Sequence, residues 1–152
     1  MAQIKQLWEE ITEFKEMAKK VIDRYEKHLG HVDLSLVIAY KCINKTKPEK
    51  KAKLYDMSGQ SEPEAFTNTK KYFIKMYHDV WDIMDDNNRL LIVLSALSRI
   101  DREEPESGKI LGYDLHDQSF MARTFGVDWG IKADVPNILE RNVEFIEEPG
   151  LG

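Results

Sequence analysis

The sequence contains a single cysteine and no long apolar segment. Cys42 cannot form a disulfide within the chain, and its strand-like surroundings favour a packed thiol over a nucleophile. No apolar run approaches the roughly 18 residues that cross a bilayer. The first residues lead into an amphipathic pattern without a signal core. We therefore expect a cytoplasmic protein with no membrane partner.

Several motifs that would identify an enzyme or a nucleic-acid-binding protein are also missing. The sequence has no glycine-rich phosphate loop, no Gly-x-Ser-x-Gly elbow and no Cys-x-x-Cys pair. A formal net charge of −5 gives no general attraction for nucleic acid. One basic cluster stands out, but no aromatic residues interleave with its lysines, which favours a solvated loop over a nucleic-acid site. These candidate lysines are Lys45, Lys47, Lys50, Lys51 and Lys53.

The length of 152 residues is typical of one compact domain, so we predict a single domain over residues 1–152. Hydrophobic residues make up 42% and charged residues 32% of the chain, as in soluble globular proteins. Residues 133–152 have little periodic pattern and contain Pro136 and Pro149. They are predicted to form an irregular tail. Apolar side chains that could dock it are Ile138, Leu139, Val143 and Phe145.

The first third of the chain predicts a long helix followed by a strand. Apolar residues recur at helical spacing over residues 4–25, and this pattern places Trp8 and Phe14 in the core. Gly30 is expected to close the helix in a left-handed conformation. Residues 32–40 then alternate with a period of two, with one face fully apolar, which indicates a strand within a sheet.

The middle of the chain predicts two further strands. Residues 53–57 form a candidate short strand, and the glycine and proline that follow indicate a turn over residues 58–68. Residues 72–78 are rich in aromatic and branched side chains, which favour a strand. Alternation places His78 on the strand face of Ile74 and Met76, where partial burial accounts for it.

A nearly all-apolar helix is predicted after Asp85 or Asp86, either of which makes a good N-cap. Residues 90–97 are apolar on almost every side, so other elements must cover this helix. A shorter helix is predicted over residues 118–125, capped by Asp117 and closed by Gly126. This element order favours an α+β fold in which helices pack on one face of a small antiparallel or mixed sheet.

Several residues around the central helix resemble a known family. In the putative phage metallopeptidase family, a strand and a tryptophan precede a helix that carries His-Glu-Leu-x-His. A His-Asp pair and a Gly-x-Trp ending follow. The corresponding residues here are Trp81, Asn87-Asn88-Arg89, Gly112, Leu115-His116-Asp117, Phe120, Phe125-Gly126 and Trp129. The resemblance implies a small zincin-like domain, an analogy at the level of the fold.

The catalytic residues of that family are not retained at the corresponding positions. The first histidine falls on Ser95, the glutamate on Ala96 and the second histidine on Arg99. Histidines four apart on a helix hold zinc, and the glutamate deprotonates the metal-bound water. Serine is a poor zinc ligand, alanine cannot act as a base, and arginine stays protonated. The sequence therefore predicts no bound metal and no other cofactor.

Two residues of the implied site remain, His116 and Asp117. A single histidine cannot organise a tetrahedral zinc site, so we interpret His116 as a helix-terminal or surface residue. Arg99 has two open interpretations. Its guanidinium could enter the vacated metal position and pair with Asp117 or Asp114, or it could point to solvent near the helix end. The pairs His28 with His31 and His78 with Asp82 are weaker candidates for a site.

These observations favour a non-catalytic, metallopeptidase-like phage protein that binds a host protein and inhibits host or defence machinery in the host cytoplasm. Two alternatives stay open. A working metal-dependent peptidase could use His116, Asp117 and an unrecognised ligand set. The lysine-rich segment could instead bind nucleic acid, with an affinity that falls steeply with salt.

Overall fold

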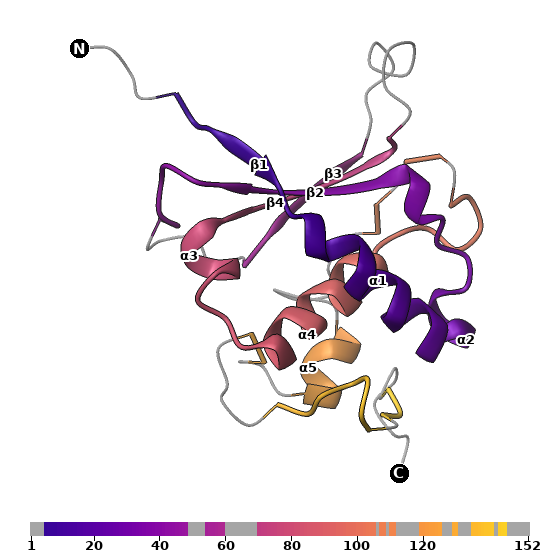
Figure 1. Cartoon of the computed structure of the whole chain (residues 1–152). Coiled ribbons are helices and arrows are strands. Elements are labelled where there is room, and N and C mark those ends of the chain that lie inside the picture. Colours follow the sequence, from indigo (N-terminus) through magenta and orange to yellow (C-terminus); the bar gives the residue numbers. More distant parts are fainter. Residues whose placement is uncertain are drawn as a thin grey trace.

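The fold centres on a four-stranded mixed sheet with helices packed against one side (Figure 1). The computed structural model describes residues 5–48, 54–59, 70–105, 107–108, 110–111, 119–125, 129–130, 135–141 and 143–145. The strands are β1 (Trp8–Glu10), β2 (Val37–Cys42), β3 (Asp56–Gly59) and β4 (Tyr72–Tyr77). Their order in the sheet is β1-β2-β4-β3. β2 and β4 are parallel, whereas both outer pairs are antiparallel. The predicted α+β class with a mixed sheet is confirmed.

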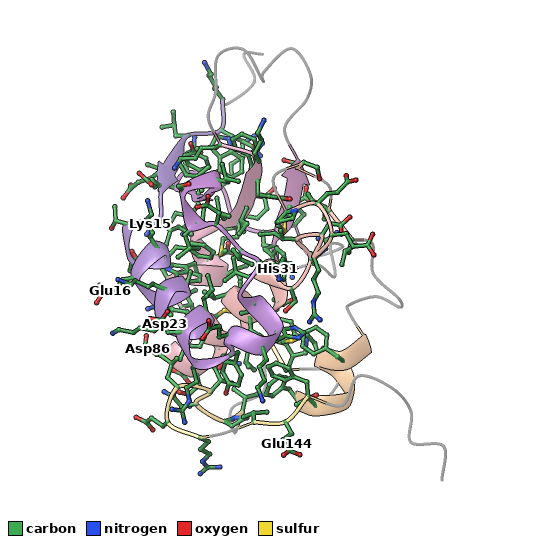
Figure 2. All side chains as sticks on the ribbon, turned by 90° about the vertical axis from the view of Figure 1, so that its right-hand side faces the viewer. Lys15, Glu16, Asp23, His31, Asp86 and Glu144 are labelled. Carbon is green, nitrogen blue, oxygen red and sulfur yellow. The ribbon has the colours of Figure 1, made fainter. Side chains whose placement is uncertain are left out.

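The helices are α1 (Thr12–Arg24), α2 (Glu26–Leu29), α3 (His78–Trp81), α4 (Asp86–Leu97) and α5 (Ser119–Phe125), with a 3₁₀-helix at Leu34–Leu36. Helices α1, α4 and α5 lie on one side of the sheet, and α3 follows directly from the end of β4 (Figure 1). The polar side of α1 faces outward, where Lys15, Glu16 and Asp23 project from the ribbon (Figure 2). Among the described residues, no helix is long and apolar enough to span a membrane.

The core lies between the sheet and α4. Tyr72, Ile74 and Met76 of β4 alternate toward the helices and are buried, as are Val37 and Ala39 beside them in β2. Every residue of α4 from Leu90 to Leu97 is buried. The prediction that this helix is covered on all sides is therefore confirmed.

Several other elements also match their prediction. Asp85 has extended backbone angles and occupies the N-cap of α4, although its side chain makes no capping hydrogen bond. α5 ends at Phe125 as expected, while its predicted cap Asp117 and closing Gly126 lie outside the described residues. The described part of the tail packs on the core through Ile138, which is fully buried, and through Leu139, Val143 and Phe145.

The tail is held by polar contacts to the helices. The Arg24 Nε and the Tyr25 hydroxyl both donate to the carbonyl oxygen of Ile138, at 3.1 and 2.5 Å. The Asn88 amide donates to the Trp129 carbonyl oxygen at 2.8 Å from a buried position on α4. These bonds tie the end of α1 to Ile138 and α4 to Trp129.

The prediction of one helix over residues 4–25 is wrong at its start. Trp8–Glu10 forms β1, which pairs with β2, and α1 begins only at Thr12. The Ile11 amide donates to the Ala39 carbonyl oxygen at 2.9 Å, so the chain stays extended until the helix begins. Because this segment is short, pairing with a neighbouring strand outweighs its helical periodicity. Trp8 is 40% exposed and does not belong to the core, while Phe14 is buried as predicted.

The region after α1 also differs from its prediction. Gly30 ends α2 with φ of −61°, a right-handed conformation instead of the expected left-handed one. The strand predicted over residues 32–40 starts only at Val37, because Asp33 folds the preceding residues into the 3₁₀-helix. The Asp33 carboxylate accepts from the Ser35 amide at 3.0 Å and from the Ser35 hydroxyl at 2.6 Å. Such local bonds compete with strand pairing.

Two smaller corrections concern the middle of the chain. The short strand predicted over residues 53–57 begins at Asp56 and continues through Ser58 and Gly59, which were expected in a turn. His78 is the first residue of α3 and does not continue the alternation of β4. The remainder of the predicted turn, residues 60–68, lies outside the described residues.

Candidate functional site

Two of the three positions that correspond to catalytic residues lie inside the core. Ser95 and Ala96, in the last turn of α4, both have no exposed surface. The helix reaches this position as a continuous apolar segment, so both side chains point into packed protein whichever side they face. These positions are therefore not open to solvent.

The Ser95 hydroxyl has a specific partner. Its Oγ lies 2.7 Å from the hydroxyl oxygen of Tyr55, which precedes β3 and is also buried. A hydrogen bond between two buried hydroxyls satisfies groups that would otherwise be costly to remove from water. The tyrosine therefore occupies the space beside Ser95 and fixes the direction of its hydroxyl.

Arg99 lies just beyond the end of α4, where the backbone tightens. The Ser98 amide bonds to the Leu94 carbonyl oxygen, whereas the Arg99 amide bonds to Ala96, one residue closer. The half-buried Arg99 side chain donates from Nε to the Leu111 carbonyl oxygen at 3.1 Å, and the Leu111 amide donates to the Arg99 carbonyl oxygen at 2.7 Å. Arg99 thus closes the base of the loop that follows α4.

Arg99 was expected either to pair with Asp114 or Asp117 or to point to solvent. The side chain is engaged with Leu111 and does not simply extend into solvent. Its other expected partners, Asp114 and Asp117, lie outside the described residues, as does His116. The proposed pairing with either aspartate remains a prediction.

The residues at these three positions do not fit a zinc site. The Ser95 oxygen is engaged with Tyr55, Ala96 has no ligand atom, and the guanidinium of Arg99 repels a divalent cation. In the described parts of the chain, no group of three His, Cys, Asp or Glu side chains has the arrangement of a metal site. Ser95, Ala96 and Arg99 therefore offer neither the ligands nor the base that a zinc-bound water needs.

His28 lies next to the end of α4 and connects it to the loop that follows. The Ser98 hydroxyl donates to the Leu94 carbonyl oxygen at 2.6 Å, so it accepts from His28 Nε2 at 2.9 Å. Nδ1 of the same ring then accepts from Arg102 Nη2 at 2.7 Å. The ring also contacts Phe120 and Phe145, with centroids 5.1 and 4.8 Å away. His28 is therefore a packing and hydrogen-bonding centre between α2, α4, α5 and the tail.

His31 is a second histidine at this end of the molecule, near the centre of the view in Figure 2. Its Nε2 lies 3.0 Å from the Ile100 carbonyl oxygen, to which it donates. Burial lowers the pKa of His31 below its ordinary value of 6.5, and the charge of Arg102 lowers it further. The bond to Ile100 and the charge of Asp101 oppose this shift. His28 and His31 thus bond to different partners and do not form a metal pair with each other.

The lowered pKa of His31 predicts a loss of stability in acid. Because the folded state disfavours the protonated ring, the unfolded chain binds more protons once the pH falls below about 6.5. The free energy of unfolding should therefore decline as the pH is lowered from 7.5 to 5.5. Thermal midpoints measured across this range test the prediction. In the His31→Gln variant the decline should be shallower, and an unchanged slope would contradict the assignment.

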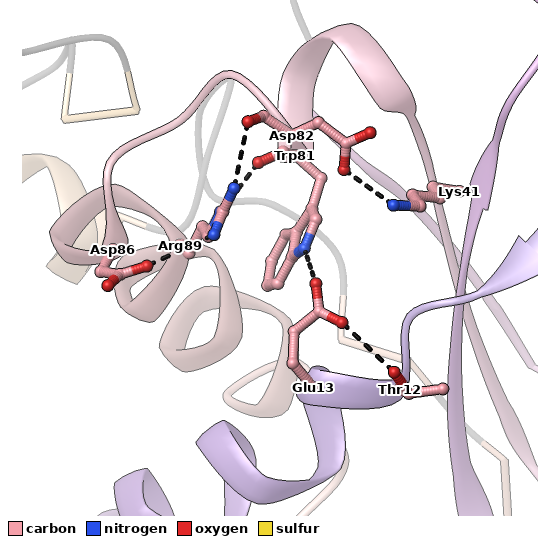
Figure 3. A network of polar contacts seen from close by, with 7 residues as sticks. All are labelled: Thr12, Glu13, Lys41, Trp81, Asp82, Asp86 and Arg89. Atoms are coloured by element: carbon pink, nitrogen blue, oxygen red, sulfur yellow. Dashed lines mark hydrogen bonds and ion pairs between the residues drawn. The ribbon is translucent and has the colours of Figure 1, made fainter.

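Trp81 and the residues around it form a polar network that holds α4 in place (Figure 3). The fully buried Trp81 donates its indole N–H to Glu13 of α1 at 2.6 Å. Arg89 donates from Nε to the Trp81 carbonyl oxygen at 2.8 Å, and its guanidinium carbon lies 5.4 Å from the centre of the indole ring. Arg89 also bonds to the Asp82 carbonyl oxygen and to Asp86. The network links α1, α3 and the first turn of α4.

The charges of this network affect Glu13. Burial raises its pKa, but the bond from Trp81, a backbone amide and the charges of Lys41 and Arg89 outweigh burial and lower it below 4.5. Glu13 therefore stays ionised over the neutral range. Lys41 itself bonds to Asp82 at 2.8 Å, so the Asp82 carboxylate forms an ion pair with β2, and a site formed by His78 and Asp82 stays a prediction.

The lysine-rich segment is only partly described. Lys45 and Lys47 are half-buried, and the Lys47 amide donates to the Asp79 carboxylate at 2.9 Å. Lys50, Lys51 and Lys53 lie outside the described residues. The described part is a connection anchored to α3, and whether the segment binds nucleic acid remains untested.

Sequence reasoning did not identify Tyr55 as part of this region. Tyr55 and Ser95 are 40 positions apart, and neither lies in a motif that would connect them. Their contact follows from the pairing of β3 with β4, which brings the start of β3 over α4. A buried serine in an apolar helix was the only available signal, since such a hydroxyl needs a partner.

The hydrogen bond between Tyr55 and Ser95 should be measurable by a double-mutant cycle. Tyr55→Phe and Ser95→Ala each remove one hydroxyl, and the coupling free energy between them should be about 0.5–1.5 kcal/mol. The free energy of unfolding in urea gives each value. Tyr77→Phe, in β4, is a matched control that should show no coupling to Ser95→Ala. A coupling of zero between Tyr55 and Ser95 would contradict the contact.

Comparison with known proteins identifies the origin of this scaffold. A family model described as putative phage metallopeptidase matches residues 6–141. No curated protein and no solved structure gives a significant match. The matched range includes every helix and strand from β1 to α5. It confirms the family to which the sequence showed a resemblance. The chain therefore belongs to the putative phage metallopeptidase family.

Proposed function

We propose that this member of the family does not hydrolyse peptides and acts by binding a host protein, which it inhibits. The hydrogen bond between Tyr55 and Ser95 carries the first part of this proposal. A metal ligand is needed at this position, and a buried hydroxyl pair occupies it instead. Ala96 supplies no general base, and the charge of Arg99 opposes a divalent cation.

A binding role is supported by apolar side chains on the surface. Leu7, Trp8 and Ile43 are 52%, 40% and 43% exposed. Leu7 and Ile43 lie beside each other and Trp8 lies on the opposite face, so apolar surface is exposed on both sides of this sheet edge, as at interaction sites. Membership of a phage family supports a host protein as the partner, from the host or defence machinery, and we propose that the two meet in the host cytoplasm.

Metal content and peptidase activity test the catalytic half of the proposal. Protein purified without chelators should contain far less than one zinc ion per chain. It should cleave a casein or mixed-peptide substrate no faster than the Ser95→Ala variant does. One bound zinc per chain, together with hydrolysis that a chelator abolishes, would show an active peptidase with a different ligand set.

The binding half is tested by crosslinking and affinity capture from a bacterial host lysate. We expect one host protein to be enriched at a fixed stoichiometry and to lose its activity when the purified chain is added. The Arg99→Ala variant asks whether the loop that follows α4 contributes to the contact. If no host protein is enriched, and the chain instead binds DNA with an affinity that falls steeply with salt, nucleic-acid binding replaces this proposal.

A further inference from the structure

β1 leaves one edge of the sheet without a neighbour among the described residues. It is the first strand in the order β1-β2-β4-β3 and pairs only with β2. The Ile43 amide donates to the Leu7 carbonyl oxygen, and the Ile11 amide donates to Ala39. In an antiparallel ladder such residues alternate with residues whose backbone groups point away from the partner. The N–H and C=O groups of Trp8 and Glu10 therefore point outward from the sheet.

The side chains along this edge combine apolar and acidic groups. Leu7 and Trp8 are well exposed and lie on opposite faces of the strand, and Ile43 is exposed beside Leu7. The Lys75 ammonium lies 5.9 Å from the centre of the Trp8 ring and packs it against the outer face of the sheet. Trp8 is thus held in position but remains accessible.

Glu9 and Glu10 give the edge a negative charge. Both are exposed, and neither forms an ion pair in the described part of the chain. Lys41 lies opposite Glu9 in β2, but its ammonium bonds to Asp82 at 2.8 Å. Two adjacent carboxylates on an open strand favour a neighbouring strand that carries lysine or arginine.

The same charges argue against pairing between two copies of this chain. A two-fold antiparallel pairing that uses the whole of β1 places Glu9 of one copy directly opposite Glu9 of the other. Like charges directly opposite on neighbouring strands are destabilising. Natural edge strands use such charges to prevent self-association. The preferred occupant is therefore a strand of a different protein.

We propose that β1 is a docking edge for an extended segment of the partner protein that alternates apolar and basic side chains. The outward groups of Trp8 and Glu10 supply main-chain hydrogen bonds, as in other cases of strand addition. Trp8 packs on an apolar side chain on one face of the segment, and Glu9, on the opposite face of β1, pairs with a basic side chain on the other face. This inference rests on the proposed binding function and names the surface that carries it.

A synthetic ten-residue peptide that alternates valine and lysine is a direct probe. On adding it to ¹⁵N-labelled protein, we expect the amide signals of Trp8 and Glu10 to shift in a saturable manner. A peptide that alternates valine and glutamate should cause no such shift. Mass spectrometry of the same samples reports whether the peptide is cleaved. Cleavage would contradict the non-catalytic function but not the docking edge.

Three variants separate charge, backbone and general effects. Glu9→Lys should weaken binding of the lysine peptide about tenfold, because an attractive cross-strand pair becomes repulsive. Glu16→Lys makes a similar charge change on the outward face of α1 (Figure 2) and should leave binding unchanged. Glu10→Pro removes an outward N–H that the β2 ladder does not use, so it should abolish binding and preserve the thermal midpoint.

Two results would overturn the docking edge. One is an absence of binding, or equal binding by the protein and the Glu9→Lys variant. The other is a dimer in sedimentation that Glu10→Pro dissociates, which would make a second copy the occupant. In either case a host protein captured through another surface would leave the proposed function intact.

Discussion

Replacing Ala96 with glutamate is expected to destabilise the protein by about 3–5 kcal/mol, the usual effect of an uncompensated charge in a core. The family resemblance implies glutamate at this position, where it would act on metal-bound water. Here Ala96 is fully buried in an apolar helix, so the new carboxylate would displace packed side chains and lose its hydration. Urea unfolding at pH 7 measures the loss.

The matched control is Ala96→Gln, which has nearly the same volume without the charge. It should also destabilise the protein, through overpacking, but by less than glutamate does. The difference between the two should shrink as the pH is lowered and the buried carboxyl becomes protonated. If Ala96→Glu keeps the parental stability, or if zinc stabilises it, the position faces an open metal site and the non-catalytic proposal is wrong.

The elements that the sequence predicted well are those whose pattern has one physical interpretation. The apolar segment of α4 follows an N-cap at Asp85 and must be covered on every side. The aromatic and branched residues of β4 favour a strand, and Ile74 and Met76 are buried there as alternation requires. In both cases local preference and tertiary packing agree, so the sequence alone identifies the element.

The start of the chain had two compatible interpretations. Leu7, Trp8 and Ile11 fit a helical period, but Leu7, Glu9 and Ile11 also fit a strand that pairs with β2. Pairing with β2, a strand about 30 positions away in the sequence, makes this segment a strand, and no local pattern can indicate that pairing. The same limit applies to the site, because the hydroxyl of Tyr55 reaches Ser95 only after β3 has paired with β4.

The residues retained from the family pattern and those lost from it have different roles in the structure. Trp81, Asn88 and Arg89 match the family resemblance, and their bonds join α3 to α1, α4 to Trp129, and α4 to α3. The positions of the metal ligands and the base hold Ser95, Ala96 and Arg99. Under the proposed function, the scaffold contacts persist without the chemistry, as expected if the fold is maintained for binding.

Trp81 should contribute the most to stability among the retained residues. Its side chain is fully buried, donates to Glu13 and carries Arg89 on its ring (Figure 3). We expect Trp81→Ala to cost about 3–5 kcal/mol, because it leaves a large cavity and removes the anchor between α3 and α1. Urea unfolding measures this loss, and far-ultraviolet circular dichroism checks that the variant still folds.

Two milder variants separate the indole hydrogen bond from the cavity. Trp81→Phe keeps most of the ring but removes the N–H, and should cost about 1–2 kcal/mol. Glu13→Gln keeps an acceptor and should cost less than about 1 kcal/mol, because Glu13 lies at the surface.

Since the pKa of Glu13 is lowered in the fold, its stabilisation is present above pH 4.5 and is lost as the pH falls through the folded pKa. Glu13→Gln should therefore flatten the acid limb of the stability profile. Trp81→Phe should flatten the acid limb of the stability profile as Glu13→Gln does, and Trp81→Ala should add only the loss of stability that the cavity causes. That pair of results would show that the hydrogen bond to Glu13 anchors α1. A Trp81→Ala variant of unchanged stability would show that α4 is held by other contacts.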